Sequence, residues 1–304
     1  MRKPWIVGAI LAGVLLGGCG DPASGPEEPA PAAPRASATT HQRAPASPGP
    51  EPGTEPGRVA PRVLFLGDSL AMEGQKVLGQ ELRRDLKARY TGAPYSGTTL
   101  CDYLEGTAER SLVPASDKAA ALVRRLRPDF VVLQFWGNSW GYTPCMDGIT
   151  YDKSPARYFR RYDADARRLT EQITAAGGGS GPRIVWVSQG PDPITPDRVR
   201  RVNALYEKRA AASGGLVADA GKAVSPASDR YTWTQYLPCT AHERARPGLC
   251  TQPGRDRTAL HRDDDYLHFC LAPTTTRPKP CPVRSPGILR IAREVTKTIR
   301  QAAR

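Results

Sequence analysis

The chain has 304 residues and a formal net charge of +13 at pH 7, which leaves room for one large domain or two small ones. The first 60 residues carry five basic and five acidic side chains, so the whole excess of positive charge belongs to residues 61–304. This charge favours anionic partners, although a basic composition that merely reflects the genome is the alternative. If the chain is exported, as its N-terminus indicates, wall polymers or lipid headgroups are more plausible anionic partners than nucleic acid.

The N-terminus is typical of an export signal. Two basic residues precede an apolar run from Trp5 to Leu16, which ends in Leu16-Gly17-Gly18-Cys19. The run is shorter than the roughly 20 apolar residues of a membrane-spanning helix. Its end resembles a bacterial lipobox, which implies cleavage before Cys19 and a lipid on the Cys19 thiol. We therefore expect residues 1–19 to be a lipoprotein signal peptide; an ordinary cleaved signal with an incidental cysteine is the alternative.

Residues 20–60 differ in composition from the rest of the chain. Proline, alanine and glycine dominate, and Val59 is the only apolar side chain larger than alanine between Asp21 and Ala60. Such a segment cannot bury enough surface to fold, so we predict a disordered linker. The protein is then exported and tethered to the outer face of the bacterial cytoplasmic membrane, with its folded part held off the bilayer.

Residues 61–304 are predicted to form a single domain in which strands and helices alternate. In chain order the patterns predict a strand at 62–66, helices at 71–90 and 116–126, a strand at 130–135, a helix at 158–176, a strand at 183–188, a helix at 196–212, a strand at 216–220 and a final helix at 285–303. This alternation predicts an α/β fold, a three-layer α/β/α sandwich around a mainly parallel sheet. The stretch 231–282 shows no regular pattern.

Six cysteines lie beyond Cys19, and an even count in an exported chain suggests disulfides. Their spacing favours the pairs Cys101–Cys145, Cys239–Cys250 and Cys270–Cys281. Zinc is the competing use, but the sequence contains no CxxC pair.

Two short motifs far apart in the sequence carry the candidate chemistry. Gly67-Asp68-Ser69 follows the first predicted strand, and Asp265-Tyr266-Leu267-His268 lies near the end of the chain. A hydroxyl is a poor nucleophile unless an imidazole takes its proton, and a carboxylate must fix the tautomer of that imidazole. Ser69, His268 and Asp265 fit these three roles, with Asp263 and Asp264 as rivals of Asp265.

With these motifs the chain resembles the SGNH, or GDSL, hydrolase family. Members carry a serine in Gly-Asp-Ser after the first strand, then a glycine and an asparagine in two later loops, then Asp-x-x-His near the C-terminus. Ser69, Gly97, Asn138 and the Asp265–His268 motif match these blocks in order. The resemblance implies a flavodoxin-like fold of the SGNH hydrolase type. It also implies an oxyanion hole made by the amides of Ser69 and Gly97 and the carboxamide of Asn138.

The match departs from the family at one block. The family often has Gly-x-Asn-Asp, whereas here Gly137-Asn138 is followed directly by Ser139. Acyl-transferring branches also vary at this block, so the departure weakens a simple esterase assignment more than it weakens the fold. A Cys101–Cys145 disulfide would clamp both oxyanion loops, and a Cys270–Cys281 disulfide would brace the loop that carries His268.

Other readings of the same residues remain open at this point. His261, Asp263, Asp265 and His268 are the residues of an alternative metal site. His242 and His261 belong to no motif and are expected on the surface. Trp136 and Trp140 flank Asn138, where they would either stack on a sugar ring or belong to the core.

The leading hypothesis is an extracytoplasmic serine esterase that needs neither cofactor nor metal. It would remove short acyl groups from cell-wall glycans or small esters. An O-acyltransferase acting on peptidoglycan or exported polysaccharide with the same three residues is the second hypothesis. It would need a membrane partner to deliver the acyl group. A non-catalytic wall-binding lipoprotein is the third.

Overall fold

A computed structural model describes residues 59–140, 143–227, 229–273, 275 and 279–304. The predicted signal peptide, Cys19 and nearly all of the predicted linker lie outside these residues. In the part of the chain that the structure describes, no helix is both long enough and apolar enough to cross a membrane.

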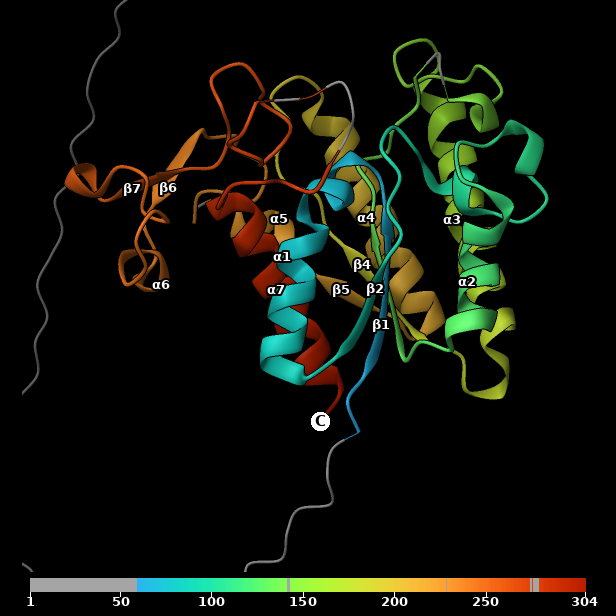
Figure 1. Ribbon diagram of the computed structural model, residues 1–304. Coiled ribbons are helices and arrows are strands. Elements are labelled where there is room, and N and C mark those ends of the chain that lie inside the picture. The colour runs from blue at the N-terminus through green and yellow to red at the C-terminus, as the bar shows by residue number, and fades with distance from the viewer. Residues whose placement is uncertain (1–58, 141–142, 228, 274, 276–278) are drawn as a thin grey trace, which may run out of the picture. The chain divides into compact units, whose positions relative to one another are not determined.

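A parallel sheet lies at the centre of the described domain (Figure 1). Its strands have the order β2-β1-β3-β4-β5. The strands are β1 (Arg62–Gly67), β2 (Arg89–Gly92), β3 (Phe130–Gln134), β4 (Arg183–Val187) and β5 (Leu216–Ala218). Every neighbouring pair is parallel. β3 is buried along its whole length, as expected of a parallel strand covered on both faces.

Helices cover both faces of this sheet, which confirms the three-layer α/β/α sandwich. Alternate side chains of the strands point to opposite faces: Leu64 and Leu66 pack with one cluster, whereas Val63 and Phe65 pack with the other. The first cluster includes residues of α2 (Ala119–Leu126), α3 (Pro155–Gly177) and α4 (Pro196–Ser213), and the second includes residues of α1 (Ser69–Leu86), α5 (Ala220–Ala223) and α7 (Pro286–Ala302). α1 and α7 lie side by side in Figure 1.

The predicted elements match the structure closely except near residues 90 and 220 and in the stretch 231–282. The strand expected to reach Ala220 ends at Ala218, and Ala220 is the first residue of the short helix α5. The helix expected to reach Tyr90 ends at Leu86, because Lys87 takes up a left-handed conformation with φ of 54°. Tyr90 instead belongs to β2, an edge strand that pairs with β1 and that the sequence did not predict. Short 3-10 helices complete the connections: η1 (Leu100–Tyr103), η2 (Ala108–Arg110), η3 (Ala115–Asp117), η4 (Pro144–Met146), η5 (Gly178–Ser180) and η6 (Pro253–Arg255).

The stretch 231–282 is less irregular than its sequence suggests. It contains a two-stranded antiparallel sheet of β6 (Tyr236–Pro238) and β7 (Arg257–Ala259), and the short helix α6 (Ala241–Arg244). Each strand has only three residues, which is too short for an alternating pattern to be recognised. The Cys239–Cys250 disulfide closes the connection between the strands. The loop that carries His268 follows β7 within the same stretch.

Candidate active site

The position of Ser69 follows from a tight junction between β1 and α1. A Cβ on Gly67 would lie 2.0 Å from the carbonyl oxygen of Gln134, so only glycine permits this approach of β1 to the end of β3. Ser69 is the first residue of α1. Its amide therefore belongs to the helix N-terminus, where backbone N–H groups favour negative charge.

Asp68 fixes this junction from a fully buried position. Its carboxylate accepts hydrogen bonds from the backbone amide of Leu70 at 3.1 Å and from that of Trp136 at 2.5 Å. It thereby caps α1 and ties the helix to the loop after β3. Burial raises the pKa of Asp68 to about 6, although both backbone hydrogen bonds oppose the shift.

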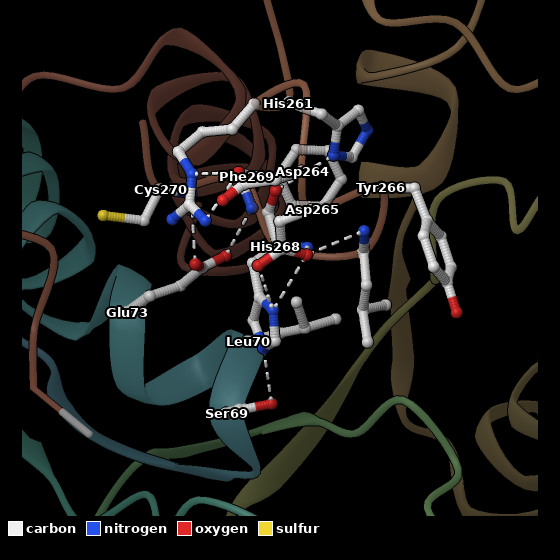
Figure 2. Close-up of polar contacts among 12 residues, drawn as sticks. Ser69, Leu70, Glu73, His261, Asp264, Asp265, Tyr266, His268, Phe269 and Cys270 are labelled. Carbon is white, nitrogen blue, oxygen red and sulfur yellow. Dashed lines mark hydrogen bonds and ion pairs between the residues drawn. The ribbon is translucent and has the colours of Figure 1, made fainter. Parts of the chain in front are cut away.

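Ser69, His268 and Asp265 form a continuous series of hydrogen bonds (Figure 2). The Ser69 Oγ lies 3.0 Å from Nε2 of His268, and Nδ1 of His268 lies 3.0 Å from Oδ2 of Asp265. Because Nδ1–H donates to the carboxylate, Nε2 is left to accept the proton of the Ser69 hydroxyl. The structure thus brings together the three side chains that the sequence placed in these roles.

The pKa shifts of Asp265 and His268 favour an ionised carboxylate beside an imidazole that readily accepts a proton. Burial opposes ionisation of Asp265, but hydrogen bonds from the side chain and backbone of His268 outweigh it and hold the pKa of Asp265 well below its usual range. Burial also disfavours the imidazolium of His268. The hydrogen bond to Asp265 and the nearby negative charge of Glu73 outweigh that effect, so the pKa of His268 is raised.

The rival acids point elsewhere. Asp264 forms an ion pair with Arg262 at 2.7 Å, and Asp263 accepts a hydrogen bond from the side chain of Gln235. Asp265 is the member of the three that contacts the imidazole of His268.

The three predicted oxyanion donors line one pocket with His268. Its volume is about 350 Å³, and its walls include Ser69, Gly97 and Asn138. Gly97 has φ of +77°, a left-handed conformation that favours glycine. The Nδ2 of Asn138 donates to the carbonyl oxygen of Thr98 at 3.0 Å and lies 3.3 Å from Oδ2 of Asp68.

Two buried side chains that the sequence did not single out hold the Asn138 loop. Arg198 of α4 donates from Nη1 to the carbonyl oxygens of Trp136 and Gly137, at 2.7 and 3.2 Å. Tyr158 of α3 donates to the same Gly137 oxygen at 2.7 Å. Neither residue lies in a motif, and only the packing of α3 and α4 against the sheet brings them here.

The two tryptophans next to this loop have different environments. Trp136 is 5% exposed and belongs to the core, with the guanidinium of Arg198 4.7 Å from its ring centroid. Trp140 is 45% exposed and lines the pocket, and its indole N–H donates to Oδ1 of Asn138 at 3.1 Å. Trp140 is therefore the one of the two that a ligand in the pocket can reach.

The expectation that His261 lies on the surface was wrong. Its side chain is buried between the rings of Trp233 and Phe269, with centroid distances of 5.5 and 4.5 Å. Its Nδ1 lies 3.0 Å from the carbonyl oxygen of His268, so it supports the backbone of the proposed base. Burial lowers the pKa of His261, which favours the neutral imidazole. His242 is partly exposed.

The alternative metal site does not form among the described residues. The cluster found there with three possible ligands is Cys239, Cys250 and Asp256, and its two cysteines are bonded to each other. His261, Asp263, Asp265 and His268 do not bring their ligand atoms together in this way.

All three predicted cysteine pairs are disulfides in the structure. Cys101–Cys145 joins η1, which follows the Gly97 loop, to η4, which follows the Asn138 loop. Cys270–Cys281 closes the segment that begins two residues after His268.

No protein-family model and no curated protein matches this sequence. Among solved structures, the chain is similar to the psychrotrophic esterase EstA from Pseudoalteromonas sp., with 13% sequence identity and a TM-score of 0.43 over 79% of this chain and 97% of that chain. It is also similar to the family 3 carbohydrate esterase of Clostridium thermocellum, with 11% identity and a TM-score of 0.45 over 80% of this chain and 96% of that chain.

Proposed function

We propose that this chain is a serine ester hydrolase of the SGNH, or GDSL, type. The observation that carries the proposal is the hydrogen-bonded series from Ser69 Oγ through His268 to Asp265 in the wall of a pocket of about 350 Å³. A serine, an imidazole and a carboxylate in this order are the parts of a nucleophilic acyl-transfer site.

In the first half of the reaction, Nε2 of His268 takes the proton of Ser69 as Oγ bonds to the ester carbonyl carbon. The imidazolium is stabilised by Asp265, which stays ionised. The tetrahedral intermediate then collapses, its carbon–oxygen bond to the alcohol breaks, and the alcohol leaves with the proton from His268. The acyl group remains on Ser69 Oγ.

The second half repeats these steps with water. His268 takes a proton from the water molecule, whose oxygen bonds to the acyl carbon, and then returns the proton to Ser69 Oγ as the free acid leaves. In both halves the negative oxygen is stabilised by the amides of Ser69 and Gly97 and by Nδ2 of Asn138. Asn138 would exchange its longer contact, 3.3 Å to Asp68, for this oxygen.

The substrate that we propose is a short-chain O-acyl ester on a cell-wall glycan. The pocket walls are apolar at Met72, Leu267 and Pro280, which suits an acyl chain. The exposed ring of Trp140 at the same pocket suits a sugar face. The predicted lipid anchor at Cys19 would keep the enzyme outside the cytoplasmic membrane, close to such glycans.

Hydrolysis of p-nitrophenyl acetate, butyrate and octanoate by the purified domain tests the reaction and the acyl length. We expect the wild type to hydrolyse the two shorter esters and the Ser69→Ala variant to hydrolyse neither. Absence of turnover with every ester and with acetylated glycan oligosaccharides would refute the proposal. Acetyl transferred to an added oligosaccharide in place of free acetate would instead identify the O-acyltransferase.

A further inference from the structure

Glu73 is a buried carboxylate for which the reaction steps above have no role. It lies one turn after Ser69 on α1, is 6% exposed and lines the same pocket. A buried acid next to a general base affects that base through its contacts and its charge.

The contacts of Glu73 lead to the segment that directly follows His268. Its Oε1 accepts the backbone N–H of Phe269 at 3.0 Å, and its Oε2 accepts that of Cys270 at 3.1 Å (Figure 2). Its own carbonyl oxygen accepts the N–H of Cys281 at 2.9 Å. One residue of α1 therefore binds both ends of the disulfide-closed segment 270–281.

The charge of Glu73 acts on the imidazole of His268. Burial raises the pKa of Glu73 to about 7, against the opposing effects of His268 and of the two backbone N–H groups. Ionised Glu73 in turn raises the pKa of His268, in the same direction as Asp265. Other titratable groups near this pair are Asp68 and Asp265, which also act on His268, and His261, whose pKa is lowered by burial and by the charge of His268. Arg262 and Lys279 line the pocket. α7 and β3 present the uncharged Ile288, Ala292 and Gln134 to the small space beside Glu73.

We propose that Glu73 is a positioning residue for the general base: its carboxylate docks the segment after His268 onto the helix that begins at Ser69, and its negative charge sets the pH range in which His268 accepts a proton. The proposal rests on the proposed function of Ser69 and His268. It adds a second acid, from a different element, to the control of the imidazole.

Two substitutions separate the docking from the charge. Glu73→Gln removes the charge and places an amide N–H₂ group where one backbone N–H needs an acceptor. Glu73→Asp keeps the charge but is shorter by one methylene. We therefore expect Glu73→Gln to change both kcat and the pH midpoint, and Glu73→Asp to lower kcat while the midpoint stays near that of the wild type.

The experiment measures kcat/KM for p-nitrophenyl acetate against pH, together with an NMR titration of the His268 imidazole. With Glu73→Gln we expect the midpoint of the acid limb to move down by up to roughly 1 pH unit, because the ionised fraction of Glu73, whose pKa is raised to about 7, no longer favours the imidazolium. The NMR midpoint should move by the same amount. We also expect kcat to fall roughly 10- to 100-fold as the base is displaced.

Leu82→Ala is the matched control. Leu82 is a buried residue farther along the same helix that packs against the sheet, so its truncation destabilises α1 without a change of charge. The proposal is overturned if Glu73→Gln leaves both midpoints unchanged, or if Leu82→Ala shifts them equally. The NMR titration does not depend on turnover. An inactive wild type with a Glu73-dependent His268 midpoint would therefore refute the proposed function and leave the charge effect of Glu73 intact.

Discussion

The nucleophile and the base of the proposed site are held by different means. Ser69 lies where a buried strand meets a long helix, and its position follows from the backbone of β1 and α1. His268 lies in a segment with little regular structure, where a disulfide at Cys270, the carboxylate of Glu73 and a turn closed by Asp265 replace secondary structure.

This difference has a consequence for mutational effects. The backbone at Ser69 is fixed by the hydrogen bonds of strand and helix and by the buried carboxylate of Asp68, so loss of the Ser69 hydroxyl alone should not move it. The position of His268 depends on a few cross-links, so loss of any one of them is expected to alter the distance from Nε2 to Ser69 Oγ. Substitutions in the two regions should therefore separate chemistry from positioning.

Ser69→Ala removes the nucleophile and leaves its supporting structure in place. We expect the rate of ester hydrolysis to fall by roughly 10⁶-fold, as for loss of a catalytic serine, with an unchanged melting temperature. Ser96→Ala, at another serine of the same pocket, should retain nearly full activity in the same assay. Equal losses in the two variants would contradict the role of Ser69.

Asp265→Asn removes the carboxylate that accepts the hydrogen bond from Nδ1 of His268. We expect kcat to fall by about 10⁴-fold, because an amide no longer holds His268 in the tautomer that accepts a proton at Nε2. The neighbouring variants Asp263→Asn and Asp264→Asn should have nearly wild-type kcat. A large loss of kcat in either of them, with activity preserved in Asp265→Asn, would show that the other aspartate orients His268.

Asn138→Ala tests the proposed oxyanion hole. Loss of one oxyanion donor lowers kcat by roughly 10²- to 10³-fold, and KM is expected to change little because the donor acts on the transition state. Steady-state kinetics with p-nitrophenyl acetate measures both. An effect on KM alone would show that Asn138 binds substrate without stabilising the oxyanion.

Removal of a disulfide is expected to have the smallest effect on activity of the changes considered, and it compares the region of Ser69 with that of His268. In the chain-entropy model, Cys101→Ser/Cys145→Ser loses about 4 kcal/mol of the free energy of unfolding, and Cys270→Ser/Cys281→Ser about 3 kcal/mol, because the second loop is shorter. Urea denaturation measures these values. We expect the larger loss of kcat in Cys270→Ser/Cys281→Ser, since Cys270 lies two residues after His268. A greater loss of kcat in the first variant would contradict positioning by the second disulfide.

The same contrast explains how much the sequence could predict. The strand, turn and helix around Ser69 have a local pattern of apolar residues, and their bounds agree with the structure to within a few residues. The three short blocks at Gly97, Asn138 and His268 could be placed because their order matches that of the SGNH hydrolase family, which the chain resembles. These signals depend on residues that are neighbours in the chain.

The remaining features depend on contacts between distant residues. β2 is a four-residue edge strand in which exposed and partly buried residues alternate, and Tyr90 is its only large apolar side chain, so it carries no alternating apolar signal. The burial of His261 and the contacts of Arg198 and Glu73 arise from elements that meet only in the folded domain. Long-range hydrogen bonds of this kind leave no pattern in a single sequence.

The most direct test of the proposed site is the reaction of the purified domain with a fluorophosphonate, followed by peptide mass mapping. A reactive serine bonds to phosphorus with loss of fluoride only when its hydroxyl is activated by a base. We predict one label, on Ser69, which is absent in His268→Ala although that variant remains folded. A folded wild-type domain without a label on Ser69, or a label that persists unchanged in His268→Ala, would contradict the account.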